Sequence, residues 1–262
     1  LTNDAEYLAL YDRTMAAFDA YMKGENTWFK KNYAAVADRP NQIAYFSFEF
    51  GLHESLPVYA GGLGILAGDH LKEASDMGIP LMGVGFIYRQ GYFVQHITED
   101  GWQETRNYYL NFEEMPVVPV LDSAGKPLMI SVELPGREVF ARLWEVHVGR
   151  VTLLLMDSNV ETNSEYDRQL TERLYSNDLE VRISQEILLG MGGVRALRLL
   201  GVEPAVWHMN EGHSAFLALE RLLEYVRRGI SLEESMAQVR KTSIFTTHTP
   251  VPAGNDQFPL WL

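Results

Sequence analysis

The sequence contains no cysteine among its 262 residues. Disulfide frameworks and thiolate metal sites are therefore excluded, and this composition is typical of a reducing compartment, so we expect a cytoplasmic protein. No run of eighteen apolar residues occurs, and the first residues lack the basic and apolar regions of a signal peptide, so we expect no membrane partner. Because the sequence does not begin with methionine, we also expect it to be part of a longer chain.

Basic residues are scarce and do not cluster. Lysine and arginine number 22 against 35 aspartates and glutamates, which gives a formal net charge of −13. A nucleic acid is therefore not an expected partner, whereas a neutral or small anionic ligand is compatible with this charge. The hydrophobic content of 47% is ordinary for a globular protein, and the length allows one large α/β domain or two modest ones.

The chain is organised around residues 43–85, which read as an apolar strand, a glycine-rich turn, an amphipathic helix and a second apolar strand. This order predicts a βαβ-like unit. Gly61, Gly62 and Gly64 permit a tight turn at the start of the helix, where free backbone N–H groups could bind an anion. A glycine turn of this kind can equally serve only to pack two elements closely, and the spacing does not decide between the two interpretations.

The remaining patterns predict an α/β fold with a mainly parallel sheet, since strands and helices alternate. An apolar stripe over residues 4–23 predicts a helix that packs on the body of the protein. Residues 88–96 alternate like a hairpin with Gly91 at its turn, and β-prone runs over residues 117–157 predict an antiparallel meander inserted beside the parallel sheet. A helix is predicted over residues 178–200, where three glycines indicate a close approach of another element.

Polar residues follow three predicted strands, at the edge of an open α/β sheet where ligands bind. Glu49 could accept a hydrogen bond from a sugar hydroxyl, hold a cation, or form a surface ion pair. His208, Glu211 and His213 lack the H-E-x-x-H spacing, so we expect no metal site. Glu49 and Glu211 could form the carboxylate pair of a glycoside hydrolase, but the sequence does not give their separation.

Three segments carry a resemblance to a known family. They are YFSFEFGLHESLPVYAGGLGILAGDHLKEASDMGIPLMGVGFIYRQGYFVQ, WHMNEGHSAFLALERL and FTTHTPVPAGNDQF. In this order they resemble the α-glucan (glycogen/maltodextrin) phosphorylases, in particular the shorter bacterial and archaeal branch. The resemblance implies a GT-B type fold, of which residues 1–262 would be the N-terminal Rossmann-like lobe with a β-rich insert at about 117–157. It also implies a glycosyltransferase of carbohydrate metabolism that transfers terminal α-1,4-linked glucosyl units to inorganic phosphate and releases glucose 1-phosphate.

The resemblance assigns roles to individual residues. Gly61, Gly62, Leu63 and Gly64 are similar to the glycine loop over the substrate phosphate and glucose. His248 matches a histidine that meets the sugar at the cleaved bond, and Glu49 matches an acidic residue near the cofactor phosphate, so both are catalytic candidates. Asn210, Glu211 and His213 match a segment of the cleft floor that supports substrate binding. Asn255 stands where this branch has a histidine, which affects one peripheral contact.

The resemblance further implies pyridoxal phosphate as cofactor, with α-1,4-glucan and phosphate as partners, and it is compatible with a homo-oligomer. The family's Schiff-base lysine lies in a G-T-x-N-x-K type segment of a C-terminal lobe, which these residues do not contain, so we expect them to be inactive alone. One alternative is a nucleotide-sugar glucan synthase of the same architecture, although that class has a lysine just before the glycines where Tyr59 and Ala60 stand here. Another alternative is a non-catalytic glucan-binding or regulatory module.

Overall fold

The fold is built around one mixed sheet. The computed structural model describes residues 3–37, 42–106, 108–250 and 256–262. The sheet has eight strands in the order β10-β9-β1-β2-β8-β7-β5, with β6 paired to β7. The bounds are β1 Ile43–Phe46, β2 Leu81–Phe86, β5 Val118–Pro119, β6 Met129–Leu134, β7 Arg137–Val148, β8 Val151–Asp157, β9 Val206–Asn210 and β10 Ser243–Thr246.

The parallel half of the sheet confirms the prediction from the sequence. β1 pairs in parallel with both β2 and β9, β9 pairs in parallel with β10, and β2 pairs in parallel with β8. β2 is buried at all six positions, as its nearly continuous apolar sequence predicts for a strand covered on both faces. The helix between β1 and β2 is α4, Gly62–Met77, and it ends at Gly78 in the left-handed conformation (φ 71°).

The antiparallel meander forms as predicted, but its placement beside the parallel sheet is wrong. β8 pairs in parallel with β2 on one side and antiparallel with β7 on the other, so the meander continues the same sheet. β6 and β7 are joined at Gly136, which has a positive φ of 74°. The reason is that β8 is apolar on both faces, which suits an internal strand better than the edge of a separate layer.

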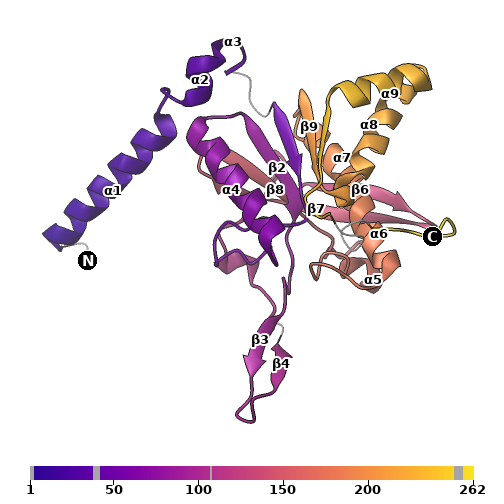
Figure 1. The fold of residues 1–262 in the computed structure, drawn as a ribbon. Coiled ribbons are helices and arrows are strands. Elements are labelled where there is room, and N and C mark those ends of the chain that lie inside the picture. Colours follow the sequence, from indigo (N-terminus) through magenta and orange to yellow (C-terminus); the bar gives the residue numbers. More distant parts are fainter. Residues whose placement is uncertain (1–2, 38–41, 107, 251–255) are drawn as a thin grey trace.

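Helices cover both faces of the sheet. Figure 1 shows α4 on one side and α6, α7 and α8 on the other. The described helices other than α4 are α1 Ala5–Lys23, α2 Trp28–Asn32, α3 Ala34–Ala37, α5 Glu165–Arg168, α6 Leu179–Ile187, α7 Gly193–Leu199, α8 Phe216–Arg227 and α9 Leu232–Lys241, with short 3-10 turns η1 Phe112–Glu114 and η3 Gly212–Ser214.

The long helix predicted after residue 178 is interrupted by a π-helical turn, η2 Leu188–Gly192, between α6 and α7. Asp178 caps α6 with its side chain, as predicted. A Cβ on Gly190 would lie 2.5 Å from the backbone N of Leu217, and one on Gly193 would lie 2.5 Å from the Phe46 ring. The glycines therefore allow α8 and β1 to pack directly against this helix, which is the close approach that the sequence predicts.

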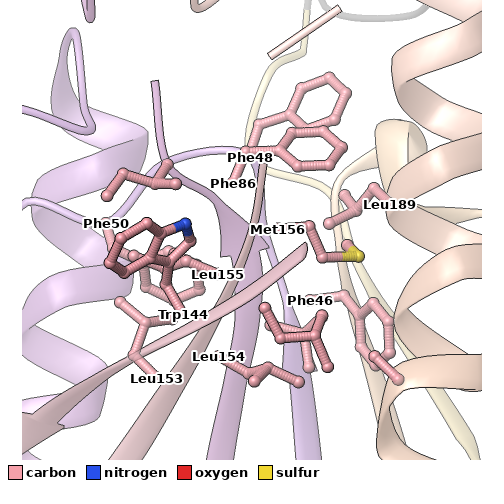
Figure 2. Close-up of a cluster of buried hydrophobic side chains, with 14 of the residues drawn as sticks. Phe46, Phe48, Phe50, Phe86, Trp144, Leu153, Leu154, Leu155, Met156 and Leu189 are labelled. Carbon is pink, nitrogen blue, oxygen red and sulfur yellow. The ribbon is translucent and has the colours of Figure 1, made fainter. Parts of the chain in front are cut away.

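A single hydrophobic core lies between the sheet and these helices. Figure 2 shows its centre, where rings from the segment after β1 meet the apolar side chains of β8 and the π-helical turn. Phe46, Phe48 and Phe50 are at most 1% exposed, although only Phe46 belongs to a strand. The segment that follows β1 is thus anchored by its aromatic side chains, which fixes the position of the polar residues between them.

The first helix contradicts the prediction that it packs on the body. Asp4 caps the start of α1 as predicted, but none of the helix residues is buried, and Figure 1 shows that α1 extends away from the sheet. Only its last turn is attached, where the Tyr21 hydroxyl bonds to Ser75 Oγ at 2.6 Å and to Asp76 Oδ1 at 2.7 Å. No helix of the described residues is both long and apolar enough to cross a lipid bilayer.

The hairpin predicted over residues 88–96 is wrong in its position, because the hairpin that forms lies further along the chain. The strands are β3 Val94–Ile97 and β4 Gln103–Arg106, which pair antiparallel and project from the body (Figure 1). Gly91 has a positive φ of 61°, but it forms a β-bridge to Arg173 and is not the hairpin turn. Alternation in the sequence does not distinguish a local turn from a bridge to a residue 82 positions away.

Candidate functional site

The predicted site residues lie at the carboxyl ends of neighbouring parallel strands. β1 is followed by Glu49 and the glycine turn, β9 ends in the segment from Asn210 to His213, and β10 is followed by His248. Thr246 is in register with Asn210, so the two latter segments start side by side. The topology therefore brings all three sequence motifs to one edge of the sheet, where open α/β folds bind ligands.

The glycine turn begins α4 without a side-chain cap. Gly61 is the N-cap residue and provides no side-chain acceptor, so the first-turn amides of Gly62 and Leu63 have no capping side chain. A Cβ at Gly61 or Gly62 would have no heavy atom within 4 Å, which means that the turn faces open space. A helix N-terminus with exposed amides is suited to bind an anion, and this geometry supports the anion-binding interpretation of the turn.

Glu49 lies behind the turn and is 2% exposed. Its Oε2 accepts hydrogen bonds from the backbone N–H of Ala60 at 2.7 Å and of Gly61 at 3.2 Å, while its Oε1 accepts one from the Tyr175 hydroxyl. The carboxylate therefore fixes the backbone just before the helix. Its oxygens are engaged by the protein itself, which favours a positioning role for Glu49 over direct proton transfer.

Glu211 connects the loops that follow β9 and β10. It has a positive φ of 67°, rare for a residue with a side chain, and its carboxylate is 4% exposed. Oε1 accepts hydrogen bonds from the backbone N–H of His248 at 2.5 Å and of Thr249 at 3.1 Å, and Oε2 accepts one from the Thr247 hydroxyl at 3.2 Å. The strained backbone aims this carboxylate at the next loop, where these bonds and a further one from the Thr249 hydroxyl to Oε1 at 3.3 Å hold it.

His248 is exposed and is fixed through its ring as well as its backbone. Its Nε2 lies 2.9 Å from Asn210 Oδ1, and Asn210 in turn donates from Nδ2 to Ser47 Oγ at 3.2 Å. Asn210 is completely buried. The histidine ring is thus oriented by a buried amide, while its remaining ring nitrogen is available to a ligand at the edge of the sheet.

His213 is a buried neutral histidine. Its Nε2 accepts a hydrogen bond from the backbone N–H of Phe48 at 3.1 Å, and its ring stacks on the Phe48 ring with 4.4 Å between centroids. Burial, with the nearby positive charge of Arg182, lowers the pKa of His213 to about 3. It therefore accepts a proton poorly and supports the segment after β1, in keeping with the expected supporting role.

The three residues considered for a metal use separate partners. His208 Nε2 lies 2.7 Å from Thr246 Oγ1, whereas Glu211 and His213 bind the backbone groups described above. Burial first, and then the nearby histidines His70 and His248, lower the pKa of His208 to about 4. Among the described residues, no group of three or more histidine, aspartate and glutamate side chains is arranged to hold a metal ion.

The sequence analysis does not identify an ionic cluster beside the site, in which Arg182 and Glu186 are buried and Asp256 is exposed. Arg182 on α6 donates from Nη2 to Asp256 Oδ2 at 2.7 Å and from Nε to Glu186 Oε1 at 3.2 Å, and its guanidinium lies over the Phe48 ring. Burial, followed by a hydrogen bond to Asp256, raises the pKa of Glu186 to about 8. In the sequence, the only sign of this cluster is the i, i+4 helical spacing of Arg182 and Glu186, which does not reveal Asp256 as the third partner.

A cavity of about 330 Å³ lies between the glycine turn, the loops after β9 and β10, and α6. It is lined by Leu63 of the glycine turn, by Glu211 and His213, by Tyr175 from the segment that leads into α6, and by Arg182 on α6. The cavity brings Leu63 of the glycine turn together with residues 211–213, and Thr249 places the loop of His248 at the same wall. Asn255, the predicted departure in that loop, lies outside the described residues.

Comparison with known proteins gives consistent matches over nearly the whole chain. A family described as a protein of unknown function (DUF3417) matches residues 1–56. The chain is 48% identical to the maltodextrin phosphorylase of Thermococcus litoralis over 260 residues, which cover 99% of this chain and 31% of that protein. It is 48% identical to the glycogen phosphorylase of Mycobacterium tuberculosis over 269 residues, which cover 99% of this chain and 31% of that protein. It is 40% identical to the glycogen phosphorylase of Aquifex aeolicus over 256 residues, which cover 98% of this chain and 36% of that protein.

The chain therefore spans about a third of the length of the curated relatives it matches. Its mixed α/β fold with a mainly parallel central sheet is consistent with the N-terminal lobe of a GT-B phosphorylase. The recognition made from the three sequence segments is confirmed by these matches. Over nearly all of its length, this chain is homologous to part of the proteins named glycogen phosphorylase and maltodextrin phosphorylase.

Proposed function

We propose that this chain acts within a longer enzyme that cleaves terminal α-1,4-glucosidic bonds of glycogen or maltodextrin with inorganic phosphate and releases glucose 1-phosphate. The observation that carries the proposal is the uncapped glycine turn at the carboxyl edge of the sheet, next to a cavity lined by the 210–213 segment. The names of the relatives support the same activity. The same proposal includes a cytoplasmic location and is compatible with a homo-oligomer.

In this proposal the glycine turn contacts the phosphate and the terminal glucose. The amides of Gly62 and Leu63 donate hydrogen bonds to phosphate oxygens, and the positive end of the α4 dipole stabilises their charge. Gly61 and Gly62 permit a close approach, since no side chain stands between the backbone and the ligand. Gly64 cannot take part in the same way, because it is buried against Tyr59 and Glu49. The absence of a side chain at Gly64 allows the turn to pack against Tyr59 and Glu49.

His248 contacts the sugar at the cleaved bond. The buried Asn210 orients the imidazole, and the Glu211 carboxylate holds the backbone on which the imidazole is carried. Both interactions are formed within the chain, so the ring is positioned before substrate arrives and no binding energy is needed to order it. His213 lines the same cavity as a neutral ring, because its pKa is about 3, and it holds the Phe48 backbone through Nε2.

Pyridoxal phosphate belongs to the proposal only for the longer enzyme. The six lysines of this sequence lie at positions 23, 30, 31, 72, 126 and 241, and none of them lines the cavity at the sheet edge. The residues present therefore do not fit a Schiff-base site. In this proposal the chain's own residues bind and orient the phosphate and the sugar.

The test measures phosphorolysis by the longer enzyme that contains this chain. The enzyme is supplied with pyridoxal phosphate and incubated with maltodextrin in the presence and absence of inorganic phosphate, and glucose 1-phosphate is quantified. Phosphate-dependent release is expected. Transfer of glucose from a nucleotide sugar to maltodextrin, without phosphorolysis, would instead identify a synthase. Retardation in glycogen gels with neither reaction would identify a glucan-binding module.

A further inference from the structure

Tyr175 has a backbone conformation that side chains rarely adopt. Its φ is 59°, and besides Glu211 it is the only residue with a side chain among the described positions that has a positive φ. A left-handed conformation of a bulky aromatic residue costs free energy, and it persists only where the surroundings determine it. The strain therefore points to a contact that requires the ring in this place.

The chain just before Tyr175 is fixed by long-range contacts. Arg173 forms a parallel β-bridge with Gly91, and the backbone N–H of Leu174 donates to the Gly91 carbonyl at 3.4 Å. Gln185 on α6 donates from Nε2 to the Arg173 carbonyl at 3.1 Å. These contacts set the path of the backbone, so the direction of the Tyr175 side chain is imposed by its neighbours.

The Tyr175 ring points to the back of the glycine turn. It packs edge-on to the Phe48 ring, with 6.5 Å between centroids, and the Arg182 guanidinium lies 5.2 Å from its centroid. Its hydroxyl donates a hydrogen bond to Glu49 Oε1, and burial, followed by the nearby Glu49 charge, raises the pKa of this hydroxyl well above its ordinary value. The hydroxyl therefore keeps its proton and acts as a donor.

Glu49 transmits this contact to the turn. Its other oxygen accepts hydrogen bonds from the amides of Ala60 and Gly61, which are the two residues directly before α4. A Cβ on Gly64 would lie 2.9 Å from Glu49 Oε2, so the carboxylate also touches the first turn of the helix from below. The contacts run without interruption from the Tyr175 hydroxyl through Glu49 to the anion-binding end of α4.

We infer that Tyr175 is a positioning residue for the glycine turn, which it holds through the Glu49 carboxylate in the orientation that binds phosphate. The inference rests on the proposed function for the identity of the anion, but the physical link is independent of it. Tyr175 also lines the same cavity as Leu63, so the segment before α6 and the glycine turn both contribute to its wall. Tyr175 itself does not contact the reacting atoms in this arrangement.

The test uses Tyr175→Phe in the longer enzyme, since phenylalanine keeps the ring on Arg182 and removes only the hydroxyl. Tyr166→Phe is the matched control, because its ring packs on Arg137 away from the turn. Three quantities are measured: the amide hydrogen exchange rate of the peptide that contains Ala60 and Gly61, the KM for phosphate, and kcat. A hydrogen bond to a charged group justifies an expected increase of about tenfold in exchange rate and in KM for Tyr175→Phe, with a smaller change in kcat.

The outcomes separate the two proposals. Unchanged exchange at Ala60 and Gly61 in Tyr175→Phe would overturn the inference, whatever the activity. If the wild-type enzyme shows no phosphorolysis, the proposed function fails, and the exchange measurement alone decides the link. Glu49→Gln provides a second variant should Tyr175→Phe fold poorly, and it is expected to raise exchange at the same two amides. Adding Tyr175→Phe to Glu49→Gln should then give less than the sum of the two effects, whereas full additivity would contradict a shared path.

Discussion

The carboxylate of Glu211 accepts a hydrogen bond from the backbone N–H of His248, with 2.5 Å between Oε1 and N. This contact joins the loop after β9 to the loop after β10. A side chain that bonds the backbone of another loop fixes its path whatever the ligand state, so the position of His248 is determined by the fold. The strained backbone of Glu211 is the cost of aiming the carboxylate there.

Replacing Glu211 with glutamine is expected to destabilise this junction. The amide keeps one acceptor oxygen but loses the charge that strengthens the bonds to His248 and Thr249, so we expect a loss of about 1–3 kcal/mol in the free energy of unfolding. Urea denaturation measures it, and phosphorolysis by the longer enzyme should fall in parallel. Glu161→Gln, at an exposed turn, is the control and should change neither quantity. Equal stability of Glu211→Gln and wild type would show that the junction is not held by this charge.

The two ends of the glycine turn are expected to respond differently to alanine. In Gly64→Ala the new Cβ would lie 2.5 Å from the Tyr59 Cβ and 2.9 Å from Glu49 Oε2, so we expect a loss of about 1–3 kcal/mol in stability from overpacking. In Gly62→Ala the Cβ meets nothing within 4 Å, so stability should be retained. Its methyl group nevertheless stands where the anion approaches, and the KM for phosphate should rise. Thermal unfolding and phosphate titration measure the two effects, and loss of stability in both variants would contradict the different packing.

Local patterns predicted most of the fold because their causes are local. Asp4 and Asp178 cap helices where a short polar side chain precedes an apolar stripe, and β2 is buried as its apolar run indicates. The errors have non-local causes. The alternating residues around Gly91 predict a hairpin turn there. Gly91 instead forms a β-bridge with Arg173, a residue that no nearby sequence pattern identifies.

The site residues that follow a strand could be predicted from the sequence, whereas those that lie elsewhere in the chain could not. Glu49, Glu211 and His248 each follow a strand of the parallel half of the sheet, so topology alone predicts that they lie at one edge, although β10 before His248 is an edge strand that is largely exposed. Tyr175 belongs to a segment of mixed pattern and Arg182 to the predicted helix that follows it, and both reach the site only through the packing of α6. Their roles depend on contacts with residues more than 70 positions away, Glu49 and Asp256, and periodicity contains no information about such pairs.

The buried His213 is expected to make stability depend on pH in the acid range. Its pKa is about 3 in the folded protein, well below the ordinary value of 6.5, because burial disfavours the charged ring. Between these values the unfolded chain binds more protons, so the stabilisation is complete above pH 6.5 and is lost as the pH falls toward 3. His213→Asn keeps an acceptor for the Phe48 amide but cannot titrate. The stability difference between wild type and this variant should therefore narrow or reverse as the pH falls, whereas the exposed His53→Asn should follow wild type throughout.

Glu186 is expected to produce the opposite dependence. Burial, followed by its hydrogen bond with Asp256, raises its pKa to about 8, so the folded protein retains a proton that the unfolded chain releases near pH 4.5. Although burial opposes ionisation of Asp256, hydrogen bonds with Glu186 and Arg182 lower the pKa of that partner. Stability contributed by the retained proton is present below pH 4.5 and is lost as the pH rises toward 8.

Glu186→Gln removes this titration while it keeps a neutral side chain that can donate to Asp256. The free energy of unfolding of the variant, measured relative to wild type, should therefore increase between pH 5 and pH 8, by on the order of 1 kcal/mol per pH unit in the middle of that range. Glu180→Gln on the same helix is the control, because that side chain is exposed, and its difference from wild type should stay constant. A constant difference for Glu186→Gln as well would mean that Glu186 is ionised beside Arg182, and the cluster would then carry one more negative charge toward the phosphate site.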